Sequence, residues 1–396
     1  MAGAPAKVVT SLGIAQTLAW ASSYYLPAML AAPMAQELGL STPSVYAAFS
    51  AALVASALVG PIAGRAIDRH GGHLVLAGTS LLFALGLAML GLAPSPIVMV
   101  VAWLVIGIAM GSGLYETAFA SLVRIYGNDA RGAITGITLF AGFASTVGWP
   151  LSAWMETQIG WRGACLGWAG IHLVLGLPLN ALLPRTQAIT PDDTLPAASS
   201  ELTNNVTKPA TTTNPKIVSL ILAFVFATTW FISTAIATHL PRMLEATGMT
   251  MAAAVGVGAL IGPAQVAARM LEFGLLRKVH PLLSARLAAL AHPIGAAVLL
   301  AGGPAFASLF AVLHGGGNGI LTIAKGTLPL VLFGTQGYGA RQGWLMLPAR
   351  VAQALAPFAF GLALDTWGAH ALWLSATIGI VAFAALMLLK TQSSAH

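Results

Sequence analysis

A nearly apolar stretch of the sequence carries three side chains that could hold a charged solute. The segment GPAQVAARMLEFGLLRK, residues 262–278, contains Gln265, Arg269 and Glu272 before two basic residues close it. The planar guanidinium of arginine can grip a carboxylate through two parallel hydrogen bonds. A glutamate three residues further along a helix can instead neutralise a cation. Three interpretations follow: a core ion pair, a helix end at a membrane surface, or a place where a charged solute is held.

The elements that position these side chains must be membrane helices. The 396-residue chain is 57% hydrophobic and only 7% charged, whereas soluble domains carry about 25% charged residues. Its mean hydropathy is +0.84, and its apolar runs reach the ~20 residues that cross a hydrocarbon core as a helix. Barrel strands would alternate over ~10 residues instead. The composition predicts an all-α polytopic membrane protein.

Other classes of protein find no support in the sequence. The net charge of +7 comes from basic residues spread singly, which does not indicate nucleic-acid binding. The single Cys165 excludes an internal disulfide and a cysteine-based metal site. No histidine pair has HExxH spacing, and we expect no metal and no cofactor. The first apolar run is too long for a signal-peptide core and is interpreted as a retained first span.

Polar and Gly/Pro breaks divide the chain into twelve predicted spans. Residues 185–216, rich in Thr, Pro, Asn and Ser, predict a flexible cytoplasmic linker between a bundle at 1–184 and a bundle at 217–396. Parallel repeats of six helices predict two pseudo-symmetric bundles with a site between them. The expected spans are 9–31, 43–64, 74–93, 97–122, 132–154, 163–183, 217–238, 251–276, 284–302, 305–333, 344–364 and 369–389.

The basic residues predict the orientation of the chain. If the N-terminus is cytoplasmic, 13 of the 18 Lys and Arg residues fall in loops on that side. Arg162 and Arg242 face outside, and Arg269, Lys325 and Arg350 fall within spans. Because cytoplasmic loops carry the excess of positive charge, both termini are expected inside.

Two weak internal matches indicate the repeat. WASSYYLPAML (20–30) recurs as WFISTAIATHLPRML (230–244) at an offset of 210, and GSGLYETAF (111–119) parallels GNGILTIAK (317–325) at 206. A rival match of ALVGP with ALIGP gives 202. It is set aside because it would move the arginine of the opening segment to the membrane surface.

The loop between the second and third spans resembles a family motif. GRAIDRHGG (64–72) is similar to the Gly-x-x-x-Asp-Arg-x-Gly loop of the major facilitator superfamily, and Gly64, Asp68, Arg69 and Gly71 match it. This sequence has Gly and His where the family motif continues with two basic residues. The resemblance covers all twelve spans. It implies the two-bundle transporter fold, alternating access, and a gating role for Asp68 and Arg69.

A narrower resemblance concerns two regions. Residues 126–162 are similar to the fifth-span region of monocarboxylate and oxalate-type carriers. Those families also place a polar residue four positions before an arginine in the eighth span, a spacing that Gln265 and Arg269 fill. Gln265 cannot release a proton. The segment GFASTVGWP (142–150) is also similar to exporters of the superfamily, so efflux stays open as an alternative.

Four spans place their principal charge at one depth. Counted from the cytoplasmic ends at ~1.5 Å per residue, Glu116, Arg269, Lys325 and Arg350 lie roughly 12–14 Å deep. Glu272 lies about one turn lower. A charge at that depth must face a partner or a cavity. Three cations meet two carboxylates, and an anionic substrate held by Arg269, with Gln265 and with Lys325 or Arg350, would neutralise the remaining charge.

The acids and histidines have alternative roles. Glu116 is either the proton carrier, because a desolvated carboxyl loads a proton more readily, or a fixed partner of a basic residue. Glu272 could pair with Arg350 or Lys325 as a structural or a gating bridge. His314 could titrate and is a further candidate for proton coupling, whereas the other mid-span histidines are expected to pack.

Aromatic residues fall on the spans that line the cavity in the superfamily, as the resemblance implies. Trp20, Tyr24, Tyr115 and Trp230 lie on the first, fourth and seventh spans. Such a wall fits a small amphipathic anion. For any single one of them, packing is the default explanation.

The sequence thus predicts a secondary transporter, not an enzyme. The expected substrate is a small organic anion, in particular a monocarboxylate, moved with protons or by exchange. The alternative is a proton-coupled efflux antiporter for amphipathic compounds. We expect the protein to be a monomer in a bacterial inner membrane.

Overall fold

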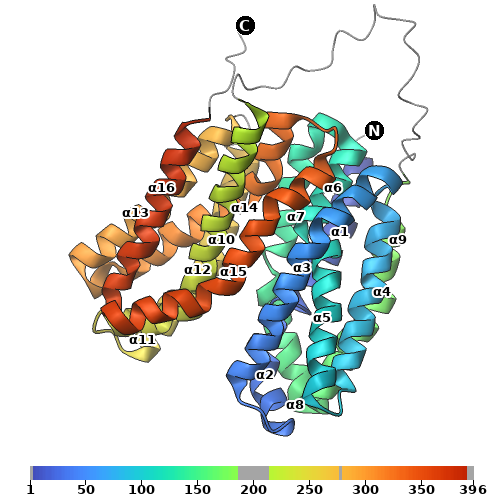
Figure 1. Cartoon of the computed structure of the whole chain (residues 1–396), viewed down its shortest axis with the longest axis horizontal. Coiled ribbons are helices and arrows are strands. Elements are labelled where there is room, and N and C mark those ends of the chain that lie inside the picture. The colour runs from blue at the N-terminus through green and yellow to red at the C-terminus, as the bar shows by residue number, and fades with distance from the viewer. Residues whose placement is uncertain (1–2, 186–213, 276–278, 390–396) are drawn as a thin grey trace, which may run out of the picture.

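The computed structural model describes residues 3–185, 214–275 and 279–389. Most of the predicted linker and several loop or terminal basic residues lie outside these described residues. The described chain is helical (Figure 1), with α1 (Gly3–Ala21), α2 (Leu26–Glu37), α3 (Thr42–His70), α4 (Gly72–Gly91), α5 (Pro96–Gly113), α6 (Tyr115–Tyr126), α7 (Ala130–Ala141), α8 (Ala144–Ile171), α9 (Leu177–Ala181), α10 (Pro215–Glu245), α11 (Met251–Gly258), α12 (Ile261–Gly274), α13 (Pro281–Gly302), α14 (Ala307–Phe333), α15 (Tyr338–Trp367) and α16 (Ala371–Met387).

These helices make the twelve passes that the sequence predicts. Within the described residues, seven helical stretches are long and apolar enough to cross a membrane, judged by length and composition. The stretch Pro96–Ala181 reverses at Gly127 and Gly160, and the stretch Tyr338–Met387 reverses at Gly368, each with positive φ. They therefore contain three passes and two passes. The interrupted pairs α1/α2 and α11/α12 supply the other two.

The two halves of the chain build separate cores. Figure 1 shows α1–α9 on one side and α10–α16 on the other. One cluster of buried apolar residues lies almost entirely in the N-terminal half, around Trp103 and Phe83. Two further clusters fill the C-terminal half, around Phe310 and Phe226. This organisation lets each half move as a body.

Glycine contacts reveal the register of the repeat. In the N-terminal half, a Cβ on Gly107 or Gly111 of α5 would meet the α3 backbone, 2.3 Å from the Ala52 carbonyl oxygen and 2.5 Å from the Ser56 carbonyl oxygen. In the C-terminal half, Gly319 of α14 approaches α12 in the same way. The equivalent α5 and α14 glycines are 208 residues apart, two more than the matched GSG and GNG motifs suggest.

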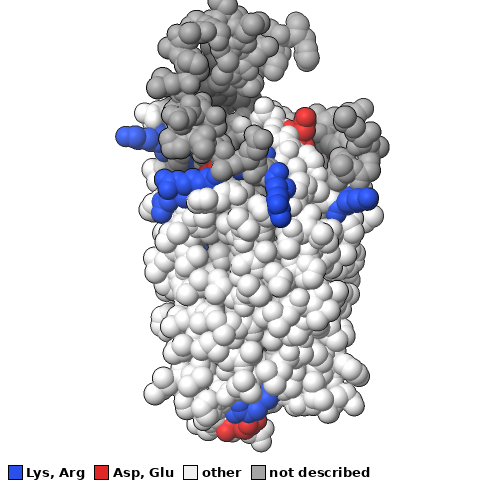
Figure 2. Space-filling model, turned by 90° about the vertical axis from the view of Figure 1, so that its right-hand side faces the viewer, with Lys and Arg blue, Asp and Glu red and all other residues white. Residues whose placement is uncertain are grey.

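The surface has the charge distribution of a membrane protein. Figure 2 shows an uncharged belt between an end rich in Lys and Arg and an opposite end with one small charged group. The start of α1 and the end of α16 both lie at the basic end (Figure 1). We call these ends the basic end and the far end.

The halves meet at the basic end and separate toward the far end. At the basic end, Asp68 of α3 accepts hydrogen bonds from the backbone nitrogens of Gly339 (2.9 Å) and Ala340 (2.8 Å) at the start of α15. At the far end, the described ion pairs join residues of the same half, and Figure 1 shows α2 and α8 diverging from α11 there. The structure is therefore closed at the basic end.

Candidate functional site

The structure brings together the four charged residues predicted to share one depth. Glu116 on α6, Lys325 on α14 and Arg350 on α15 are buried or nearly so, and Arg269 on α12 is 5% exposed. The Lys325 ammonium interacts electrostatically with the other three. The site thus forms at the boundary between the two halves, as pseudo-symmetric bundles require.

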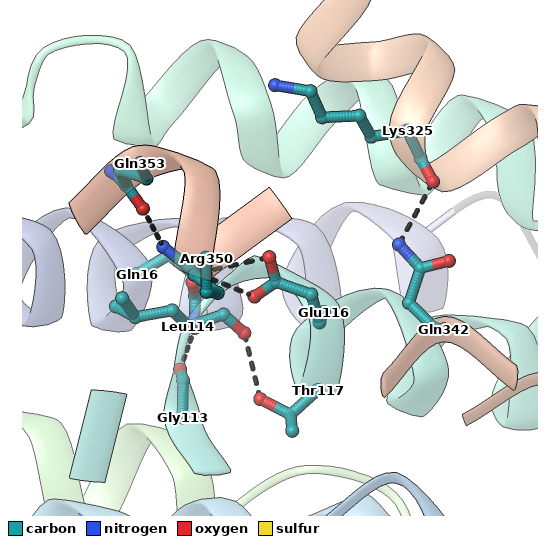
Figure 3. Close-up of polar contacts among 9 residues, drawn as sticks. All are labelled: Gln16, Gly113, Leu114, Glu116, Thr117, Lys325, Gln342, Arg350 and Gln353. Atoms are coloured by element: carbon teal, nitrogen blue, oxygen red, sulfur yellow. Dashed lines mark hydrogen bonds and ion pairs between the residues drawn. The ribbon is translucent and has the colours of Figure 1, made fainter. Parts of the chain in front are cut away.

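Glu116 and Arg350 form an ion pair across that boundary. Arg350 Nη2 lies 3.0 Å from each carboxylate oxygen of Glu116, and Arg350 Nη1 donates to Gln353 Oε1 at 3.1 Å (Figure 3). The Glu116 side chain is 12% exposed and the Arg350 side chain 3%. A cavity with an empty volume of about 230 Å³ adjoins the pair. The pair is therefore nearly buried but borders an internal cavity.

A break between α5 and α6 places Glu116 at this boundary. Leu114 is extended there, so α6 begins anew at Tyr115. The Gly113 carbonyl accepts a hydrogen bond from Gln16 Nε2 at 2.7 Å (Figure 3). Glu116 then lies in the first turn of α6, where the helix dipole favours a carboxylate. Sequence reasoning missed Gln16, whose signal was the single amide side chain in the first predicted span.

Lys325 forms no ion pair with a described residue. Its Nζ lies 4.1 Å above the ring of Trp230, and it makes no hydrogen bond or ion pair with any described residue. The residue is 4% exposed. A cation–π contact offsets part of the cost of burying the ammonium, but its charge is not neutralised.

The predicted aromatic residues line the same region. Trp20 stacks on Trp230 with ring centroids 6.3 Å apart, and contacts Tyr115 at 4.9 Å and Tyr24 at 5.4 Å. The Arg350 guanidinium lies 5.2 Å from the Trp230 ring. The indole nitrogens of Trp20 and Trp230 are buried and find no partner among the described residues. Two donors are therefore left for a ligand.

Arg269 also crosses the boundary, but to a backbone carbonyl. Its Nη1 donates to the Thr138 oxygen of α7 at 3.0 Å, and its Nη2 lies 3.4 Å from Gln265 Oε1. A Cβ on Gly142 would lie 2.6 Å from Nη1, so the guanidinium would have to shift if position 142 carried a side chain. The buried Nε has no partner in the described chain.

Two further contacts hold the basic end closed. Glu272, predicted to pair with Arg350 or Lys325, instead pairs with Arg131 of α7 at 2.8 Å. Asp68 binds the start of α15 as described above, whereas its neighbour Arg69 is exposed. In the sequence, Arg131 is one of the 13 basic residues assigned to cytoplasmic loops. Its contact with α12 could not be predicted, because it depends on how the halves pack.

His314 lies away from the charged layer. It precedes Lys325 by eleven residues on α14, and its Nδ1 is 3.0 Å from Nδ1 of His292. No group of His, Cys, Asp and Glu in the described part of the chain could hold a metal ion.

The charges of the layer do not cancel. Glu116 neutralises Arg350, and Glu272 is taken by Arg131. Arg269 and Lys325 have no carboxylate within the described residues. The site can therefore accept an anion between the two halves.

The fold and this central site define a secondary membrane transporter of two six-helix halves. Residues 12–340 match the sequence model of the Major Facilitator Superfamily. The chain belongs to that family, which consists of transporters and not of enzymes.

Solved structures of the family share the fold over nearly the whole chain. The human organic anion transporter MFSD10 (TETRAN) is 15% identical, with a TM-score of 0.70, over 97% of this chain and 99% of that one. The fucose:proton symporter FucP of E. coli is 15% identical, with a TM-score of 0.73, over 95% and 97%. The proton:xylose symporter XylE has a TM-score of 0.74 at 13% identity, over 98% and 96%. At these identities the likeness shows the fold alone.

Two curated relatives are also similar. The transcription regulatory protein OpdE of Pseudomonas aeruginosa is 29% identical over 158 residues, 39% of this chain and 38% of that protein. An uncharacterized 38 kDa protein of Thermoproteus tenax is 27% identical over 92% of this chain and 90% of its own length.

Proposed function

We propose that this transporter carries a small organic anion, in particular a monocarboxylate, by alternating access. The observation that carries the proposal is Lys325, a buried ammonium without a carboxylate partner among the described residues. A bare charge inside a membrane protein is costly, and a bound anion removes that cost. Arg269 supplies a second cation and the predicted hydrogen-bonding fork.

The wall of the site indicates the rest of the substrate. Trp20, Trp230 and Tyr115 form an apolar surface with two indole N–H donors unpartnered within the described chain. A carboxylate with a short apolar or aromatic body satisfies both features. Hydrogen bonds from indole and guanidinium would bind the carboxylate, and the rings would cover the body.

Coupling is proposed to pass through Glu116. A substrate carboxylate that reaches Arg350 competes with Glu116 for the same guanidinium. A displaced Glu116 would lose the charge that favours its ionised form, and it would then take up a proton. The substrate and the proton would therefore bind together, as symport requires. If Glu116 stays ionised and paired, the protein exchanges one anion for another.

The basic end is proposed to face the cytoplasm of a bacterial cell. Lys and Arg gather there (Figure 2). The structure is then closed toward the cytoplasm. Labelling of Arg65→Cys and Arg162→Cys in intact cells by a membrane-impermeant maleimide tests this orientation. Reaction at position 65 rather than 162 would reverse it.

Efflux of amphipathic cations is the second candidate. The aromatic cluster could hold a cation by cation–π contacts, and Glu116 could supply the negative charge. This mode needs the Glu116–Arg350 pair to open without an anion.

A thermal-shift screen decides between the two. Purified protein is melted with acetate, lactate and benzoate, and separately with tetraphenylphosphonium and ethidium. A ligand that binds only the folded state adds about 2.7 kcal/mol of stability at one hundred times its Kd. We expect benzoate or lactate to raise the melting temperature.

The variants Lys325→Gln and Arg269→Gln should melt as folded proteins without that response. Lys216→Gln, at the exposed start of α10, is the matched control and should respond as the wild type does. Stabilisation by the organic cations alone, or a benzoate response retained in both site variants, would contradict the anion proposal.

A further inference from the structure

Within the C-terminal half, a second polar site lies apart from the charged layer. A chamber with an empty volume of about 390 Å³ lies between α10, α13, α14 and α16. Its polar lining consists of two threonines, an asparagine and two histidines, namely Thr228, Thr229, Asn318, His292 and His314. Both histidines are buried, and none of these residues belongs to the ion pairs described above.

The hydrogen bonds at this site lead to an assignment of the ring protons. The Ser375 hydroxyl lies 3.0 Å from the Leu372 carbonyl, which can only accept, and we assign the hydroxyl proton to that bond. The Ser375 oxygen then accepts from His292 Nε2, also at 3.0 Å. His292 in its neutral form is then protonated at Nε2 and has a lone pair at Nδ1. That lone pair lies 3.0 Å from His314 Nδ1, which must be the donor. His314 is left with a lone pair at Nε2.

The chamber itself offers acceptors. Thr228 and Thr229 both donate their hydroxyl protons to the Val225 carbonyl, at 2.9 and 2.7 Å, and so present lone pairs to the space they line. The Asn318 side chain makes no hydrogen bond with any described residue and can turn its oxygen inward. Acceptors that line the same chamber as an imidazole lone pair suit a proton, carried on the imidazole and bridged to the acceptors by water.

We propose that His314 Nε2 is a second proton-binding site of this transporter, in addition to Glu116, and that its proton also contributes to coupling. The proton adds to the lone pair, and His314 becomes an imidazolium whose two N–H groups are satisfied by His292 and by the acceptors of the chamber. No bond other than N–H forms or breaks. The role in coupling rests on the proposed anion transport, whereas the protonation itself does not.

Titratable groups lie on most of the helices around the pair. His314 interacts electrostatically with His292. The helix α16 carries no titratable side chain in its described range. The other titratable groups on α13, α14 and the helices packed against them are Lys216, His239, Arg242 and Glu245 on α10, Arg269 and Glu272 on α12, Arg286 on α13, Lys325 on α14, Tyr115, Glu116, Arg124 and Tyr126 on α6, Arg131 on α7, and Tyr338, Arg341, Arg350 and Asp365 on α15.

The position on α14 connects the proton to the anion site. His314 and Lys325 are eleven residues apart, which is about 16 Å along a helix. A new positive charge at that distance attracts an anion bound at Lys325. At an effective dielectric constant of about 20, the gain in anion affinity is about fivefold.

The first test follows the histidines by ¹⁵N NMR of histidine-labelled full-length protein, titrated from about pH 8 to about pH 4. We expect His292 as the Nε2–H form and His314 as the Nδ1–H form at neutral pH, and reversible protonation of His314 on acidification. His172 is the matched control. It donates to Ser22 through Nε2 (2.7 Å), but its Nδ1 is buried and without a partner in the described chain, so it should stay neutral.

Ser375→Ala tests the tautomer argument without touching the lining of the chamber. Without the serine oxygen, His292 is free to carry its proton at Nδ1, which reverses the donor and acceptor of the pair. His314 should then lose its Nε2 lone pair, and its titration should shift or vanish. A His314 ring that stays neutral while the protein is folded, or one that titrates identically in Ser375→Ala, would overturn the proposal. A melting temperature that rises with sodium but not choline, without His314 titration, would also overturn it.

The second test uses [¹⁴C]benzoate in proteoliposomes. His314→Gln should keep benzoate counterflow and reach a lower accumulation under a pH gradient than the wild type, because Glu116 still couples. Accumulation like that of the wild type would separate His314 from coupling. Absence of counterflow in the wild type would count against benzoate as a substrate, and hence against the proposed function, while the NMR result would stand.

Discussion

The ion pair between Glu116 and Arg350 is the residue-scale feature that most constrains the mechanism. Each partner comes from a different half, and both are nearly buried. Such a pair contributes little when intact, but removing one partner leaves an uncompensated charge. It therefore holds the halves together only while no other anion reaches Arg350.

Glu116→Gln should show this competition directly. The variant leaves the Arg350 guanidinium buried without a carboxylate, which we expect to lower the free energy of unfolding by about 3 kcal/mol. Benzoate should then stabilise the variant more than the wild type, because Arg350 is free to bind it. Thermal unfolding with and without benzoate measures both effects.

The control is Glu245→Gln, an exposed glutamate at the end of α10 that forms no ion pair with the described residues. It should melt like the wild type. A Glu116→Gln variant with unchanged stability and an unchanged benzoate response would show that the pair does not compete with substrate.

The membership of the charged layer could be predicted from the sequence, but its pairing could not. Depth along a helix follows from residue counting, so Glu116, Lys325 and Arg350 could be assigned to one level. Their partners depend on how the halves pack. Glu272 meets Arg131, and Arg269 meets the Thr138 carbonyl, because α7 lies against α12. Neither contact leaves a local signal in the chain.

At the scale of elements, hydropathy was enough to predict the passes but not their interruptions. The run 97–122 reads as one span, yet it breaks at Leu114, and that break presents Glu116 at a helix start. The helix α8 likewise contains the end of the fifth span and the start of the sixth, one on each side of the kink at Gly160. Breaks of this kind need tertiary partners such as Gln16, which a window of hydropathy does not detect.

At the far end, Glu37 at the end of α2 contacts α8, and this contact gives a pH-dependent prediction. Hydrogen bonds from Arg162 and Trp161 stabilise the Glu37 carboxylate and lower its pKa. A group with a lowered folded-state pKa contributes stability above its ordinary pKa and loses it as the pH falls through the lowered value. Wild-type stability should therefore decline on acidification in that window.

Glu37→Gln should be less stable at neutral pH and should lack this part of the acid-dependent decline. Melting temperatures measured over an acidic pH series compare the two proteins. Parallel curves for variant and wild type would show that this contact does not stabilise the fold. The effect is expected to be small, because exposed ion pairs contribute little.

At the scale of the whole molecule, the structure shows one of two arrangements, the one in which the halves are closed at the basic end. Contacts between the halves lie at the basic end and at the charged layer, and the described ion pairs at the far end stay within each half. The predicted pseudo-symmetry explains why such a molecule can rock about its centre. Which end is closed could not be predicted, because the same sequence must be able to form both arrangements.

The closed end depends on glycines that let α3 and α15 touch through their backbones. A Cβ on Gly64 would lie 2.0 Å from the Gly339 carbonyl oxygen, and one on Gly343 would lie 2.5 Å from the Pro61 Cα. These neighbours are backbone atoms that cannot turn aside. Closure and a side chain at Gly64 are therefore incompatible.

Gly64→Ala should shift the population toward the state that is open at the basic end. Spin labels at the exposed positions of Arg69→Cys and Gln336→Cys report the separation of the two halves by pulsed electron paramagnetic resonance, and the native Cys165 is buried and should not be labelled. We expect a longer and broader distance distribution in the variant. Gly78→Ala on α4, where a Cβ has no neighbour within 4 Å, is the control. An unchanged distribution in Gly64→Ala would show that the close approach at this glycine does not determine which end is open, and the contacts of Asp68 and Arg131 would then have to hold the basic end closed by themselves.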